Sequence, residues 1–129
     1  MRRRSSWLFA LAAPVCAEYA EAHHSFAAVF DAAQPVEVTG TVTRVEWMNP
    51  HVWIYMNVAK DGGAVEEWAF EMGSPNRLTR FGWHRNSLAE GQVATITGSR
   101  SRDGSFKAAV DTVTLANGEQ LFGAQETAQ

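Results

Sequence analysis

Apolar and polar residues alternate along several short stretches of the chain from Val36 onward, which is the period of half-buried strands. In the first stretch Val36, Val38 and Val42 alternate with glutamate and threonine, and the apolar phase then shifts by one position towards Trp47. A shift of phase within one strand predicts a bulge or a strong bend, here between residues 40 and 44. Barrels use such bends to curl a long strand.

Turn signals divide the rest of the chain into further strands and one helix. Ser74 followed by Pro75 predicts a helix start, and Gly82 predicts the helix end after Phe81. Turns are predicted at Met48-Asn49-Pro50, Lys60-Asp61-Gly62-Gly63, Arg102-Asp103-Gly104 and Asn117-Gly118. The predicted strands are one that starts at residue 36, then 51–58, 64–72, 92–99, 106–115 and a short one at 120–122.

Three strands, a short helix and two further strands follow the order of an OB-type fold. We therefore expect an all-β domain with one short helix, folded as a small OB-like Greek-key barrel of five to six strands. The sequence contains no internal repeat.

The N-terminal residues have the pattern of an export signal. Arg2 to Arg4 form a basic start, residues 7–15 are apolar, and Ala20-Glu21-Ala22 is a small-x-small motif. We expect cleavage after Ala22; cleavage after Ala17 or Ala20, and lipidation at Cys16, are alternatives. The expected division is a signal peptide (1–22), an N-terminal segment (23–35), the OB-like barrel (36–122) and a flexible tail (123–129), in a periplasmic or secreted protein.

The net charge of the expected mature chain argues against nucleic acid as a partner. The chain has 11 basic and 14 acidic residues, of which the expected signal removes three arginines and two glutamates, so residues 23–129 carry a net charge of −4. An acidic domain is a poor match for nucleic acid. The apolar segment is shorter than the about 20 residues of a membrane span, so no lasting membrane anchor is expected. The expected partners are a metal ion, a small ligand or another periplasmic protein.

Histidines near the expected mature start are the candidates for metal binding. If His23 becomes the first residue, its amine and its ring nitrogen chelate one ion together, and His24 or His51 supplies another imidazole. A planar set of nitrogen donors suits Cu(II). Cleavage after Ala20 would instead leave His23 at the third position, a second arrangement that binds Cu(II) or Ni(II). Under the plain alternative, His23 and His24 are solvated residues near a terminus.

An aromatic face is the competing candidate site. Trp53, Tyr55 and Trp83 are candidates for a stacking platform of the kind that OB folds use, whereas Trp47 and Trp68 are expected to pack in the core. Under this alternative the protein is a metal-free ligand- or protein-binding module.

Catalytic motifs are lacking. The sequence has no nucleophile motif and no glycine-rich phosphate loop, and Glu67 and Glu71 are expected to lie on a solvated strand edge. His84 is expected to be exposed after the helix. A binding role, with copper held or delivered rather than used in turnover, is therefore the leading hypothesis. An oxidase or oxygenase built on the same histidines is a third class.

The chain also resembles an uncharacterised family, a domain of unknown function found in small exported proteobacterial proteins. The segments that carry the resemblance are His23-His24-Ser25-Phe26, Val45-Glu46-Trp47-Met48-Asn49-Pro50-His51, Trp68-Ala69-Phe70-Glu71, Gly73-Ser74-Pro75-Asn76 and Val113-Thr114-Leu115-Ala116-Asn117-Gly118. This resemblance implies that a mature start at His23 is typical, and it implies no activity.

Overall fold

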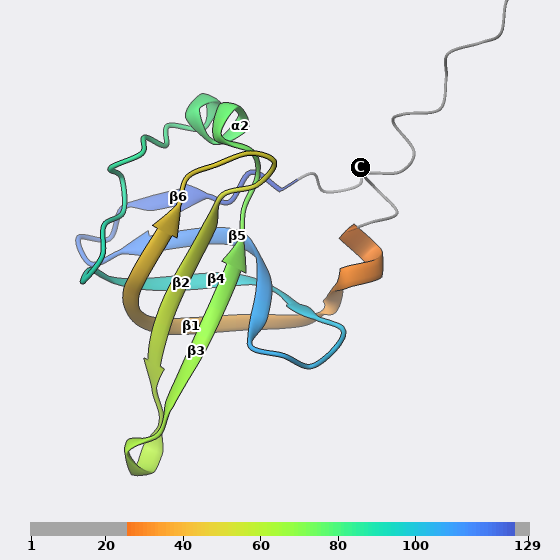
Figure 1. Ribbon diagram of the computed structural model, residues 1–129, viewed down its shortest axis with the longest axis vertical. Helices are drawn as coiled ribbons and strands as arrows, with labels where there is room; N and C mark the ends of the chain where they lie inside the picture. The colour runs from red at the N-terminus through yellow and green to blue at the C-terminus, as the bar shows by residue number, and fades with distance from the viewer. Residues whose placement is uncertain (1–25, 126–129) are drawn as a thin grey trace, which may run out of the picture.

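The computed structural model describes residues 26–125, which form six strands, the short helix α2 and a helical turn over residues 26–29 just before the first strand (Figure 1). In chain order the elements are β1 (Phe30–Glu46), β2 (Trp53–Ala59), a 3-10 turn η1 (Asp61–Gly63), β3 (Val65–Glu71), α2 (Pro75–Arg80), β4 (Val93–Ser101), β5 (Lys107–Leu115) and β6 (Gln120–Phe122). The expected all-β fold with one short helix is therefore confirmed.

The strands close into a barrel. β1 pairs antiparallel with both β2 and β4, β2 pairs with β3, and β4 pairs with β5. The ring closes where β3 runs parallel to β5, with Ala69–Glu71 opposite Lys107–Ala109. β6 adds to the outer edge of β5. This connection, with the helix between β3 and β4, is the OB-type order that the sequence predicts.

The long first strand bends as its hydrophobic phase predicts. The register of β1 against β2 shifts between Val42 and Arg44, which marks a bulge. Gly40 crosses β2 so closely that a Cβ there would lie 2.5 Å from the carbonyl oxygen of Asn57. A bulge beside a tight crossing lets one strand serve both halves of the barrel.

β1 starts six residues before the expected boundary at Val36. Phe30 is buried and pairs with Ser101 of β4, and the register then slips between Asp31 and Pro35. Residues 30–35 thus belong to the barrel rather than to a separate N-terminal segment. Because of this slip, residues 30–35 do not show the alternation of apolar and polar residues by which strands are predicted.

The residues after β3 close one end of the barrel. Ser74 caps α2 by accepting a hydrogen bond from the Arg77 backbone, as predicted, and the helix ends at Arg80, one residue before the predicted end. Trp83 is 1 % exposed, and its indole nitrogen donates to the Phe122 carbonyl at 2.8 Å. The expectation that Trp83 joins an exposed aromatic platform is therefore wrong, because the indole is buried in the core.

The start of the expected tail is packed rather than frayed. The Gly73 amide donates to the Gly123 carbonyl at 2.9 Å, and Ala124 is buried. The close packing depends on two glycines, because a Cβ at Gly73 would collide with the Ala124 backbone and one at Gly123 with the Val110 backbone. Local sequence patterns do not reveal such contacts. Residues 126–129 lie outside the described part of the chain.

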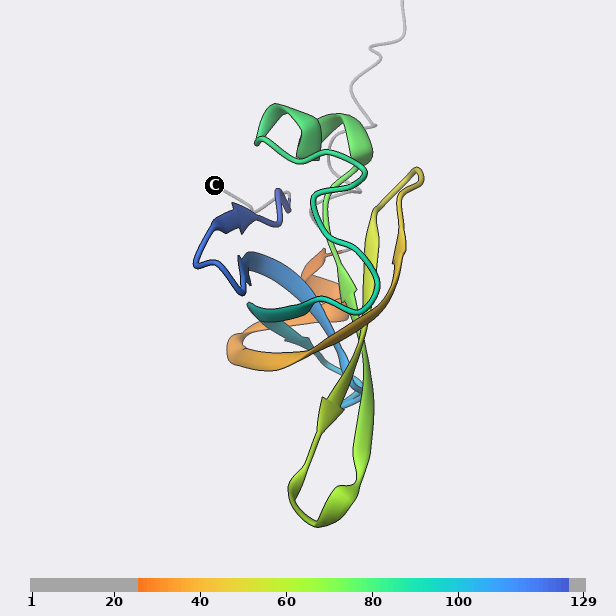
Figure 2. The ribbon, with the colours of Figure 1, turned by 90° about the vertical axis from the view of Figure 1, so that its left-hand side faces the viewer.

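The molecule is elongated, because the hairpin of β2 and β3 projects from the barrel at the end opposite α2 (Figures 1 and 2). The core holds the inward residues of all the long strands together with Leu78, Trp83 and Leu88 from the α2 segment. Within residues 26–125, no helix has the length and apolar character needed to cross a bilayer.

Candidate functional site

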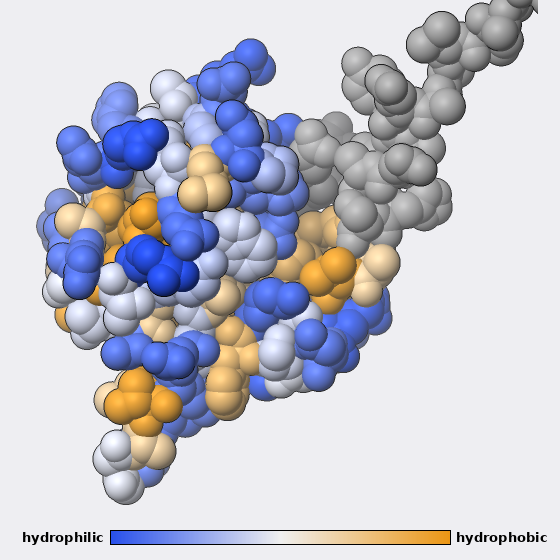
Figure 3. Space-filling view, viewed as in Figure 1, coloured by the Kyte–Doolittle hydropathy of each residue, from blue (hydrophilic) through white to orange (hydrophobic). Residues whose placement is uncertain are grey.

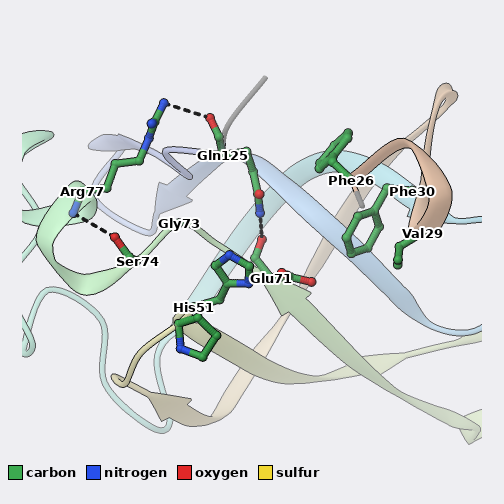
Figure 4. Close-up of a pocket in the computed structure, with 10 residues that line it drawn as sticks. Phe26, Val29, Phe30, His51, Glu71, Gly73, Ser74, Arg77 and Gln125 are labelled. Carbon is green, nitrogen blue, oxygen red and sulfur yellow. Dashed lines mark hydrogen bonds and ion pairs between the residues drawn. The ribbon is translucent and has the colours of Figure 1, made fainter. Parts of the chain in front are cut away.

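A cavity of about 420 Å³ opens beside the closed end of the barrel (Figure 4). One wall is apolar and comes from the residues at the start of β1, and the other is polar and comes from the ends of β3 and α2. The side chains that matter below are Phe26, Phe30, His51, Glu71, Arg77 and Gln125. Segments from both ends of the described chain therefore meet at this cavity.

His51 and Glu71 form the polar pair of this cavity. The Nδ1 atom of His51 lies 2.5 Å from an Oε1 oxygen of Glu71, while the side chains are 46 % and 15 % exposed. The pairing follows from the register of the hairpin, in which Trp53 lies opposite Glu71. His51 comes two residues before Trp53, so its side chain is on the same face and diagonal to Glu71. A mostly buried carboxylate thus orients a half-exposed imidazole.

The environment of Glu71 opposes its ionisation. Burial raises the pKa of Glu71 above its ordinary value, and the nearby positive charges of His51 and Lys107 offset only part of that rise. The side chain of Gln125 donates to the Glu71 backbone carbonyl at 2.5 Å, which fixes the strand end. The C-terminal segment is thereby bonded to the strand end that carries Glu71.

Glu71 is the residue that the sequence analysis misjudged. It was expected on a solvated edge together with Glu67, which is exposed. The Asp61-Gly62 turn is the sequence signal that could have identified Glu71. Counting the pairs of the hairpin from that turn places Glu71 beside the residues that precede β2, which include His51. The contact of Gln125 with the Glu71 backbone, however, comes from C-terminal residues, which local patterns did not predict to pack there.

The apolar wall of the cavity comes from the first residues that the structure describes. Phe26 and Phe30 pack with ring centroids 5.4 Å apart, and Arg102 anchors this segment by donating to the Ala27 carbonyl at 2.7 Å and to the Val29 carbonyl through its backbone. His23 and His24 lie outside the described residues. Phe26 is the first described residue after them, and it lines the same cavity as His51.

No complete metal site exists among the described residues. Within residues 26–125, no group of three or more histidine, cysteine, aspartate or glutamate side chains is placed to hold an ion. His51 has its carboxylate partner alone.

The aromatic face lies on the same side of β2 as His51, and the protein's own side chains cover part of it. Trp53 and Tyr55 stack with centroids 6.5 Å apart, and the Arg44 guanidinium sits 4.0 Å over the Tyr55 ring. Glu46 accepts a hydrogen bond from the Tyr55 hydroxyl and pairs with Arg44. A flat ligand would have to displace Arg44 to stack on Tyr55.

The remaining residues singled out from the sequence lie apart from the cavity. Met48 is 55 % exposed, and His84 is exposed in the segment after α2. Neither side chain lines the cavity wall that includes His51. His84 is therefore a suitable control for substitutions of the cavity histidine.

Comparison with known families and proteins gives one match. Residues 11–110 match the model of DUF6152, a family of unknown function. A comparison with functionally curated proteins finds no match.

Proposed function

The chain belongs to this family of unknown function. We propose that it is a periplasmic copper-binding protein. In this proposal His23 supplies its amine and imidazole, and His51 or His24 supplies a further nitrogen. The role is to hold or deliver the ion rather than to turn over a substrate.

The observation that carries the proposal is the contact between His51 Nδ1 and Glu71. When the Nδ1–H donates to the carboxylate, the lone pair remains on Nε2, which is the nitrogen available for a metal. Metal-binding histidines commonly have such a carboxylate behind them, because it fixes the tautomer and increases the basicity of the ring. Within residues 26–125, Glu71 is the one hydrogen-bonding or charged partner of the His51 ring.

Chain length supports a contribution from the N-terminal histidines. Phe26 follows His24 by two residues and His23 by three, and each residue spans at most about 3.6 Å. His24 is therefore tied within roughly 7 Å, and His23 within roughly 11 Å, of a residue that lines the His51 cavity. These limits on chain length support a site shared by His51 and the N-terminal histidines.

The direct test is a Cu(II) titration of the chain that starts at His23, with the start verified by intact mass. We expect one tight equivalent and a nitrogen-rich electron paramagnetic resonance spectrum. His23→Ala is expected to abolish tight binding, and His51→Ala to weaken it at least about tenfold, the lower end of the effect of losing even a supporting group. His84→Ala is the matched control and should bind as the wild type does.

The outcomes separate the competing hypotheses. Equal affinity of His51→Ala and His84→Ala would remove His51 from the site and leave a site confined to the terminus. Retained tight binding after His23→Ala would overturn the proposed amine and imidazole chelate. Absence of stoichiometric binding would reject copper and favour the aromatic face, for which Trp53→Ala is the diagnostic variant.

A further inference from the structure

The segment that closes the barrel is basic in an otherwise acidic domain. From Met72 to Ala89 the chain has three arginines and no acidic residue, whereas residues 26–125 as a whole contain 8 basic and 11 acidic residues. We name the exposed residues Arg80, Phe81 and Arg85 of this segment the basic cap. Among the described residues, neither Arg80 nor Arg85 takes part in an ion pair.

The cap presents an aromatic ring to solvent although its segment is firmly anchored. Leu78, Trp83 and Leu88 are buried, and Gly82 adopts a φ of +91°, which turns the chain back into the core. Phe81, between these anchors, remains 49 % exposed. Its exposure is therefore a feature of an ordered loop, rather than a result of a loop that fails to pack.

The basic cap starts at the last residue of α2, and the acidic hairpin of β2 and β3 lies at the opposite end of the molecule (Figure 1). The hairpin at the end opposite α2 carries Asp61, Glu66 and Glu67 against the single cation Lys60. Hydrophilic side chains cover much of the α2 end in the view of Figure 3. A molecule with one basic and one acidic end turns its basic end towards an anionic surface.

We propose that the basic cap docks the protein reversibly on anionic phospholipid. Arg80 and Arg85 contact the phosphates of the headgroups, and Phe81 inserts into the interface between headgroups and acyl chains. Arginine beside an exposed aromatic residue is the combination that favours such an interface. With so few groups the attachment is weak and sensitive to salt, consistent with a peripheral rather than a permanent contact.

The test is co-sedimentation of the chain that starts at His23 with vesicles. This chain retains every strand of the barrel and lacks the apolar segment 7–15, which would bind lipid by itself. We expect binding to vesicles of phosphatidylglycerol and phosphatidylethanolamine that weakens as salt is added, and much less binding to phosphatidylcholine alone. Arg80→Gln is expected to weaken binding about fivefold, and Arg80→Gln with Arg85→Gln about 30-fold.

Matched variants make the test decisive. Lys60→Gln removes the same charge at the opposite end and is expected to leave vesicle binding nearly unchanged, whereas Phe81→Ser weakens it without any change of charge. Equal effects of Lys60→Gln and Arg80→Gln would overturn the proposal, because they would reflect net charge alone. Absence of vesicle binding at low ionic strength would also overturn it and would favour an acidic protein as the partner of the cap.

Discussion

The carboxyl group of Glu71 lies against the His51 ring, and its backbone carbonyl accepts the Gln125 amide, so ionisation of Glu71 is linked to folding. Burial raises the pKa of Glu71 above its ordinary value of 4.5. The folded chain therefore binds this proton more tightly than the unfolded chain does. The resulting stabilisation is complete below pH 4.5 and is lost as the pH rises through the raised pKa.

Glu71→Gln should remove that dependence on pH. Relative to wild type, the free energy of unfolding of this variant is expected to increase as the pH rises from about 4.5 towards neutral. Urea unfolding followed by tryptophan fluorescence at a series of pH values measures the difference. Glu67→Gln removes an exposed carboxylate from the same face of β3 and is the control. A difference between Glu71→Gln and wild type that stays constant with pH would contradict the linkage.

At this scale the sequence predicted His51 as a candidate but missed its partner. His51 stands out as a histidine beside a turn, and that is a local feature. The surroundings of Glu71 depend on strand register and on the bond from Gln125 to its backbone, which comes from a distant part of the chain. Trp83 was misjudged for a similar reason, because its hydrogen bond to the Phe122 carbonyl joins two segments far apart in sequence.

The elements around the site depend on the close approach of the strand end after β3 to the C-terminal segment. A Cβ at Gly73 would lie 2.3 Å from the Ala124 carbonyl oxygen. Gly73→Ala should therefore push this segment away, and with it the Gln125 side chain that bonds to Glu71. We expect a loss of about 1–3 kcal/mol in the free energy of unfolding, measured by urea denaturation.

Gly82→Ala is the control for Gly73→Ala. It is strained by its positive φ, but a Cβ there has nothing within 4 Å to meet, so the C-terminal segment stays in place. Amide resonances of residues 123–125 should shift in Gly73→Ala and remain unchanged in Gly82→Ala. Unchanged resonances in both variants would show that the contact at Gly73 does not hold the segment.

Elements with local signals were predicted well. The Ser74 cap, the bulge after Val42 and the hairpin turns all follow from residue types at fixed spacing. The start of β1 and the packed residues after β6 were missed, since the first contains a register slip and the second is held by the pairing of Gly73 with Gly123. Pairings without alternation leave no periodic trace in the sequence.

For the whole molecule, the order of three strands, a helix and two strands was enough to predict an OB-like barrel. The order does not tell how securely the barrel is closed. The parallel seam joins β3 and β5 only over Ala69–Glu71 and Lys107–Ala109, whereas β1 and β4 pair along most of their length. The seam also includes Glu71, so opening of the barrel and disturbance of the candidate site are the same event.

Native-state hydrogen exchange should therefore detect the seam as the first part of the barrel to open. The Ala69 amide, which bonds to the Phe106 carbonyl across the seam, is expected to exchange faster than the amides of β1 and β4. The centroids of the Phe106 and Trp68 rings lie 5.4 Å apart, so this packing joins the two strands beside the bond. Phe106→Ala should speed exchange at Ala69, while Phe122→Ala, which removes another exposed ring on β6, should not. If both variants left Ala69 as slow as the β1 amides, the seam would open only with global unfolding, and the His51–Glu71 pair would be as rigid as the core.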